Sequence, residues 1–128
     1  MDDQQKTYAF NRTRQAFVAR DLDIADTHWT RIKGLLGTKP SEFAFGRGLW
    51  ILPCHGVHTI AMRYDIDVVF LDENLVVVHV EENVKPWRLT SIRTDAVSVI
   101  ELPSHTIWNT QTRVGDVIEI PCPKESAA

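Results

Sequence analysis

The sequence has little cysteine and no long hydrophobic run. Only two cysteines, Cys54 and Cys122, occur in 128 residues, which excludes a disulfide-rich scaffold and a zinc site made of paired CxxC motifs. Their spacing leaves open whether they can pair with each other. No run of about 18 uncharged apolar residues is present, and the acidic start MDDQQ lacks the apolar region of a secretory signal. The sequence therefore predicts no membrane segment and favours a cytoplasmic protein.

A clustered basic face is also missing. The chain has 14 Lys and Arg against 17 Asp and Glu, a formal net charge of -3, and the positive side chains are scattered among carboxylates. Nucleic-acid-binding domains usually gather their positive charge on one face, so nucleic acid is not favoured as a partner. With 44% apolar and 24% charged residues, the chain has the size and composition of one globular domain.

The pattern of apolar residues predicts one mainly β domain. We expect a polar lead-in at residues 1–15, the domain at residues 16–120 and a flexible tail at residues 121–128. Short β-branched or aromatic runs are typical of strands, and they occur as AFVARDLDI, RGLWIL, HTIAM, DVVFL, LVVVHV, AVSVIEL and DVIEI. Asp72 and Asn74 favour a hairpin turn between DVVFL and LVVVHV. The predicted fold is a small β-sandwich or an open barrel.

One segment, ADTHWTRIKGLLGTKP, changes to a helical period. Asp26 or Thr27 can cap a helix there, and Gly37 followed by Pro40 can end it. The apolar residues between these ends fall on one helical face: Trp29, Ile32, Leu35 and Leu36. We therefore predict one short helix near the N-terminal third, packed on the sheet through this face.

Several blocks of the sequence resemble a known family. They are, in order, GLLG, GLWILPC, VHTIAMRYDIDVVFLDENLVVVHV, VIELP and VGDVIEI. Over residues 22–120 the chain resembles the bacterial and archaeal domain of unknown function 192, also called uncharacterised protein family 0127. The resemblance implies a mainly β, sandwich-like fold and no established activity, and Glu101 and Asp116 match family positions. Asp65 stands where the family usually has Pro, so the best match is Asp67 and its strand, while the Cys and His residues look like a subgroup feature.

The stretch GLWILPCHGVHTIAMRYDIDVVFLDENLVVV holds the candidate site, because polar and sulfur-containing side chains interrupt an otherwise apolar run. The candidate pocket residues are Cys54, His58, Thr59, Met62 and Asp67. Unlike groups gathered in one stretch are typical of a binding pocket. They predict a small binding or accessory module for a small molecule or a protein, and the sequence requires no cofactor.

A metal site is an alternative for the same stretch. The C-x3-H-x3-M spacing of Cys54, His58 and Met62 resembles a cupredoxin loop, in which a thiolate, an imidazole and a weak thioether bind copper. Residues four apart in a straight strand lie about 13 Å from each other. A shared metal therefore needs a turn near Gly56 and a second histidine, which the sequence does not identify.

A thiol-dependent enzyme is the other alternative. Cys54 would be the nucleophile, His58 its base, and Asp67 or Asp65 the orienting carboxylate. The sequence shows no evident oxyanion loop and no local signature of a cysteine hydrolase. Whether the chain is an enzyme therefore stays open.

A structural role is the commonest outcome for each of these residues taken alone. The cysteine and the methionine then belong to the core, and His58 with Thr59 holds the end of a strand by hydrogen bonds. Asp67 lies in IDVVFL, which is otherwise apolar on both faces, and a buried carboxylate requires donors. Backbone amides, Arg63 or Thr59 are the expected donors.

The tryptophans divide into two pairs. Trp29 and Trp50 lie in apolar patterns and are expected in the core. Trp87 and Trp108 lie in loop-like stretches, where they can border a pocket or a partner surface. Trp87 beside Arg88 suits an acidic or planar ligand.

Overall fold

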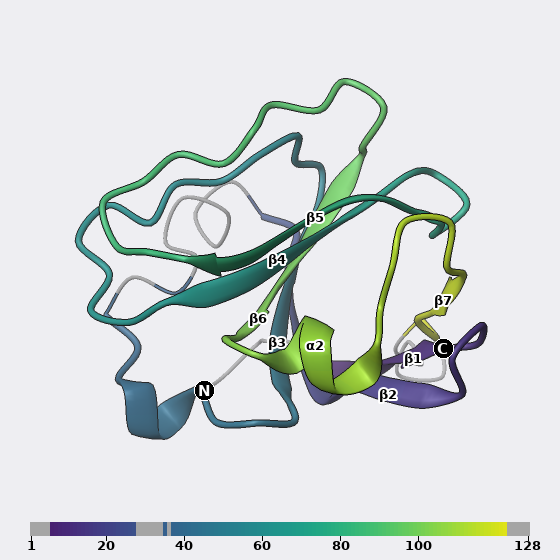
Figure 1. The fold of residues 1–128 in the computed structure, drawn as a ribbon, viewed down its shortest axis with the longest axis horizontal. Coiled ribbons are helices and arrows are strands. Elements are labelled where there is room, and N and C mark those ends of the chain that lie inside the picture. Colours follow the sequence, from purple (N-terminus) through teal and green to yellow (C-terminus); the bar gives the residue numbers. More distant parts are fainter. Residues whose placement is uncertain (1–5, 28–34, 36, 123–128) are drawn as a thin grey trace.

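The computed structural model describes residues 6–27, 35 and 37–122. Within these ranges the strands form one seven-stranded sheet in the order β5-β4-β6-β3-β2-β1-β7, which curls strongly across its width (Figure 1). The strands are β1 Lys6–Asn11, β2 Ala16–Ala25, β3 Arg47–Ile51, β4 Ile66–Leu71, β5 Val77–Val84, β6 Ser98–Pro103 and β7 Ile118–Glu119. The mainly β prediction is confirmed, and one curled sheet is closer to the open barrel than to the sandwich.

The described helices are short. The 3₁₀ helix η1 spans Pro40–Glu42, and α2 spans Thr106–Thr110, in a stretch where the sequence predicts no helix. The helix predicted near the N-terminal third lies almost entirely outside the described residues. Its expected end is described, since Gly37 has a positive φ of 85° and the Thr38 amide donates to the Leu35 carbonyl at 2.9 Å. No helix in the described ranges is long and apolar enough to span a membrane.

Two segments differ from the predicted strand pattern. Residues 58–62, HTIAM, form a loop with a single bridge at His58, because Ala61 has a positive φ of 67° that interrupts the extended backbone. Residues 6–11, which the sequence assigns to a polar lead-in, form β1. This strand pairs with β2 on one side and β7 on the other, so it belongs to the sheet.

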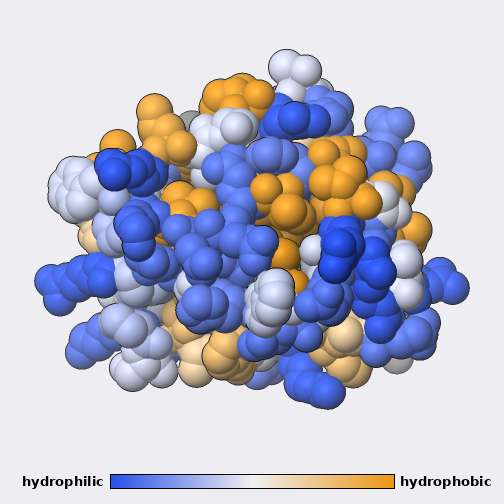
Figure 2. All heavy atoms as spheres, viewed as in Figure 1, coloured by the Kyte–Doolittle hydropathy of each residue, from blue (hydrophilic) through white to orange (hydrophobic). Residues whose placement is uncertain are grey.

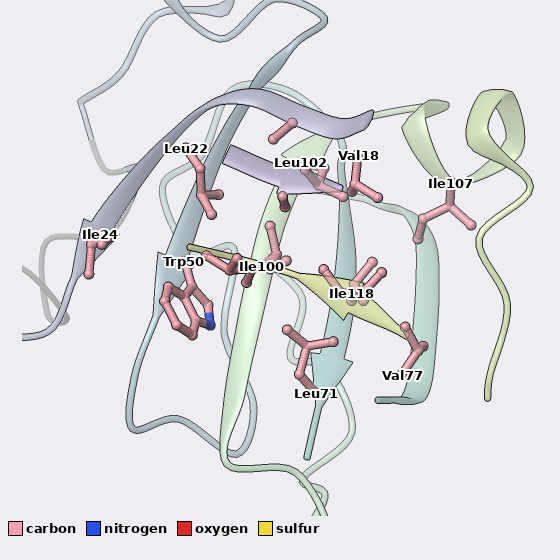
Figure 3. Packing of buried hydrophobic residues seen from close by; sticks show 14 residues of the cluster. Val18, Leu22, Ile24, Trp50, Leu71, Val77, Ile100, Leu102, Ile107 and Ile118 are labelled. Atoms are coloured by element: carbon pink, nitrogen blue, oxygen red, sulfur yellow. The ribbon is translucent and has the colours of Figure 1, made fainter. Parts of the chain in front are cut away.

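Hydrophobic residues form a cluster on each face of the sheet. The first cluster includes Trp50, Val69, Leu71, Ile100 and Leu102, and Figure 3 shows its labelled side chains converging from six strands, β2 to β7, and from α2. The second cluster holds the residues that alternate with these on the same strands: Leu49, Ile51, Ile66, Val68, Phe70 and Val99, with Leu35, Phe43, Met62, Val84, Ala25 and Ala96. The alternation of strand side chains therefore produces two separate cores.

Gly48 allows close packing under the first cluster. A Cβ atom at Gly48 would lie 2.9 Å from the Ala19 Cβ, and 3.1 Å from δ carbons of Leu22 and Leu102. The nearest of these atoms is fixed to the backbone of β2 and cannot rotate away. Strand β3 can therefore lie beside its neighbours only because residue 48 has no side chain.

Asp67 joins three separate parts of the fold. Its side chain is fully buried, and its oxygens accept hydrogen bonds from the amides of Asn83, at the end of β5, and Ile107, in α2, both at 2.9 Å. Backbone amides were among the donors expected from the sequence. The carboxylate therefore fastens α2 to strands β4 and β5.

We expect Gly48→Ala to lower the free energy of unfolding by about 1–3 kcal/mol, because the added methyl overpacks the contact with Ala19. Urea denaturation followed by circular dichroism measures this loss. The double variant Gly48→Ala, Ala19→Gly should lose less than the sum of the two single variants, since it removes the clashing methyl. A Gly48→Ala protein as stable as wild type would show that the strands separate without cost.

We expect Asp67→Asn to lower the free energy of unfolding by about 2–4 kcal/mol, since the amide nitrogen would face a backbone donor and leave it unpaired. Equilibrium urea unfolding measures this effect. Asp72→Asn changes the same group in an exposed turn and is the matched control, with a smaller expected loss. Equal losses in the two variants would refute the structural role of the buried carboxylate.

Candidate functional site

Two long loops lie side by side and cover part of the second face of the sheet (Figure 1). We call residues 52–65 and 85–97 the paired loops. The Thr90 amide donates to the Val57 carbonyl and the Val57 amide to the Thr90 hydroxyl, both at 2.9 Å. Gly56 permits this approach, because a Cβ there would lie 2.7 Å from the Ser91 carbonyl oxygen. The loops are thus fastened to each other by backbone geometry.

The buried side chain of Thr59 links the paired loops by hydrogen bonds. Its hydroxyl donates to the Lys85 carbonyl at 2.6 Å and accepts from the Arg88 amide at 2.9 Å. His58, the preceding residue, is exposed, and its Nδ1 accepts a hydrogen bond from the Ile60 amide at 3.2 Å. Thr59 therefore points inward while the imidazole of His58 faces outward.

Cys54 and Met62 come together on one face of the sheet, and Asp67 lies on the other. Met62 belongs to the second cluster and Cys54 packs against it, while the Cys54 thiol donates to the Gly56 carbonyl at 3.1 Å. Asp67 alternates with Ile66 and Val68 of the second cluster and so faces the first. Throughout residues 6–27, 35 and 37–122, no three His, Cys, Asp or Glu side chains are grouped so that they could hold a metal ion.

A buried acid lies in the middle of the second face. Glu101 on β6 is 4% exposed and sits between Leu49 of β3 and Val68 of β4. Its Oε1 has no hydrogen-bond partner among the described residues, and the buried hydroxyl of Tyr64 has none either. Buried polar atoms in native proteins are usually paired, so these two groups stand out from the apolar side chains around them.

Burial controls the protonation of both groups. It raises the pKa of Glu101 to about 8, so the carboxyl group is mostly protonated at neutral pH and can donate a hydrogen bond. Burial, followed by the negative charges of Glu101 and Glu42, raises the pKa of Tyr64 to about 12.

A polar cavity of about 330 Å³ adjoins this pair. Its lining residues are Asp23, Leu35, Thr38, Glu42, Phe43, Arg47, Gly48 and Leu49. Leu49 is the direct cross-strand neighbour of Glu101, and the ring of Phe43 lies 6.1 Å from that of Tyr64, centroid to centroid. The buried acid and the tyrosine are therefore each adjacent to one residue of the cavity lining.

Unpaired polar atoms gather around this cavity. Asp23 and Arg47 form an ion pair at 3.2 Å, and Asp23 Oδ1 also lies 3.5 Å from the Lys6 ammonium. The Asp23 Oδ1 and Arg47 Nε atoms nevertheless have no hydrogen bond in the described ranges. Together with Glu101 and Tyr64 they provide four of the five buried side-chain atoms without such a partner in the described part of the chain. The cavity thus offers both donors and acceptors.

The sequence signal for this site was partial. Glu101 was identified only through its family position, although it interrupts the buried run SVIEL just as Asp67 interrupts IDVVFL. Asp116, the other family position, accepts hydrogen bonds from Asn11, Arg14 and the Arg113 amide, at 2.9–3.0 Å, and so holds its turn against β1. Tyr64 had no local signal, because its packing beside Phe43 depends on the loop fold.

Comparison with known proteins places this architecture in a family. The model of DUF192, described as "Uncharacterized ACR, COG1430", matches residues 9–120. A UPF0127 protein of Thermococcus sibiricus is 30% identical over 123 residues, covering 92% of this chain and 77% of the relative. One from Pyrococcus furiosus is 31% identical over 114 residues, covering 85% of this chain and 94% of the relative. Both relatives are archaeal.

Two solved bacterial structures share the fold. Protein R01717 of Sinorhizobium meliloti 1021, described as a proposed transcription regulator, superposes with a TM-score of 0.75 at 16% identity, covering 91% of this chain and 93% of that one. A protein of unknown function from Novosphingobium aromaticivorans has a TM-score of 0.72 at 16% identity, covering 91% and 84%. At this identity the likeness shows the fold alone. The family match confirms the resemblance found in the sequence, and the chain belongs to the DUF192 family of UPF0127 proteins.

Proposed function

We propose that this domain is a binding module for a small polar molecule, held in the cavity beside Arg47, which Glu101 and Tyr64 would reach past the lining residues Leu49 and Phe43. The supporting observation is that two buried polar atoms without partners among the described residues belong to the lining residues Asp23 and Arg47, and two more belong to Glu101 and Tyr64, each next to a lining residue. Leaving a buried polar atom unpaired costs about 1–3 kcal/mol. A bound molecule with both donors and acceptors would remove that cost, whereas an apolar molecule would not.

The side chains suit such a ligand in different ways. A protonated Glu101 donates, the Tyr64 hydroxyl donates or accepts, and Arg47, which pairs with Asp23, has an Nε donor without a partner among the described residues. The volume of about 330 Å³ is near the lower end of small-molecule pockets, about 300–1,000 Å³. We therefore expect a compact polar metabolite rather than a large apolar one.

The residues proposed from the sequence have supporting roles in this scheme. Cys54 and Met62 pack in the same cluster as Tyr64 and would form the apolar side of the site. Thr59 would hold the paired loops above it. Neither cysteine is in a disulfide, which fits a reducing compartment, and the cytoplasm is the location we propose.

Protein purified gently, without chelator, should retain a small molecule that native mass spectrometry detects. Tyr64→Phe removes one hydroxyl and should weaken the apparent affinity for the molecule about tenfold. Less of the molecule should then be retained. Tyr8→Phe is the matched control, because the Tyr8 hydroxyl bonds Glu119 at the surface instead. A bare wild-type protein, or a retained mass unaffected by Tyr64→Phe, would contradict the proposal.

The protonation of Glu101 predicts a pH-dependent stability. Folding raises its pKa from 4.5 to about 8, so the folded state keeps a proton that the unfolded state releases between these values. Glu101 should therefore lower the free energy of unfolding by up to about 1.4 kcal/mol per pH unit as pH rises through this window.

Urea unfolding at several pH values between 5 and 8, of wild type and Glu101→Gln, measures this contribution. The variant should lose stability less steeply with rising pH than wild type, because Gln does not ionise. Glu82→Gln changes an exposed side chain and should keep the wild-type slope. Identical slopes in wild type and Glu101→Gln would show that the buried acid does not titrate in this range.

A further inference from the structure

The paired loops expose large apolar side chains on their outer side. Ile60 is 44% exposed, Trp87 64%, Leu89 76% and Ile92 72%. In Figure 2 hydrophobic atoms lie beside strongly hydrophilic ones along the upper edge of the molecule, where Figure 1 places residues 85–97. Single exposed apolar residues are ordinary, but a group on two adjoining segments indicates an interaction surface.

The backbone holds these side chains in an outward position. Thr59 and Thr90 are buried between the loops, so their sequence neighbours Ile60 and Leu89 project toward solvent. The Trp87 amide donates to the Thr59 carbonyl at 2.9 Å, which brings Trp87 beside Ile60. The apolar side chains therefore project from a hydrogen-bonded platform.

The charge of the paired loops is opposite to that of the whole chain. They contain four basic residues and two acidic ones, whereas the full sequence has 14 basic and 17 acidic residues. Lys85 pairs with Asp65 at 3.4 Å and Arg93 with Asp95 at 2.9 Å. The remaining two cations, Arg63 and Arg88, are exposed and have no acidic partner among the residues the structure describes.

We propose that the paired loops dock this protein on an anionic lipid surface. Trp87, Leu89 and Ile92 would enter the interfacial layer, while Arg63 and Arg88 would meet lipid phosphates. Tryptophan prefers membrane interfaces, and apolar side chains combined with basic ones are typical of peripheral membrane binding. This docking is independent of the proposed ligand site, since the side chains that carry it face solvent.

The observations favour lipid over a protein partner. Three of the apolar side chains are more than three-fifths exposed, so they project outward, as side chains that insert into an interface must. A protein partner would need a matching set of pockets, whereas the lipid interface accepts projecting apolar groups without one. The excess positive charge complements the negative cytoplasmic leaflet.

Cosedimentation of the full chain with vesicles tests the proposal. We expect binding to phosphatidylcholine vesicles that contain about one-third phosphatidylserine, little binding to pure phosphatidylcholine, and weaker binding at high salt. Trp87→Ala and Leu89→Ala should each reduce the partition coefficient about tenfold. Arg88→Gln should reduce it about fivefold.

Trp108→Ala is the matched control, because Trp108 is also exposed, at 69%, but lies on α2 outside the paired loops. It should bind vesicles as wild type does, and circular dichroism should show every variant folded. Leu89→Ala decides the outcome if Trp87→Ala fails to fold.

Absence of wild-type binding to anionic vesicles would overturn the proposal, and so would equal losses in Trp87→Ala and Trp108→Ala. Saturable binding to polyglutamate but not to vesicles, lost in Trp87→Ala, would overturn it in favour of an acidic protein partner. Displacement from vesicles by soluble glycerophosphoserine, with Trp87→Ala binding as wild type does, would show head-group binding alone and would also overturn it.

Discussion

Strands β4 and β6 are buried along their whole length, on both faces of the sheet. A strand covered on both sides needs a second layer above and below it, because side chains alternate between the two faces. One face is filled by the first cluster with the help of α2 and β7. The other depends on the second cluster and on loop residues such as Met62 and Val57, so the long connections are part of the core.

Two carboxyl groups buried on these strands, those of Asp67 and Glu101, have different surroundings. Asp67 on β4 faces the first cluster, where the amides of Asn83 and Ile107 satisfy it. Glu101 on β6 faces the second cluster and meets only Leu49 and Val68 across the sheet. One carboxylate therefore fastens the fold, while the other has its pKa raised by burial and keeps an oxygen without a hydrogen-bond partner among the described residues.

In the proposed scheme the paired loops would have two roles, because their two sides differ. Thr59 and Thr90 point inward and hold the loops together. Trp87 and Leu89 point outward and form an exposed apolar surface on the paired loops. The paired loops can thus cover the core with one side and present an interaction surface on the other. Gly56 permits the close approach of the two loops on which both roles depend.

The sequence by itself determined the β class, most strands, the hairpin turn between β4 and β5, the burial of Trp50 and the family. These depend on local signals, namely alternating apolar residues, turn-forming Asp and Asn, and motif order. Only the tertiary structure decided that β1 joins the sheet, that residues 58–62 form a loop and that Glu101 lies buried between Leu49 and Val68. The predicted helix near the N-terminal third stays a prediction. Contacts between distant segments depend on strand register and loop closure, which local sequence patterns do not encode.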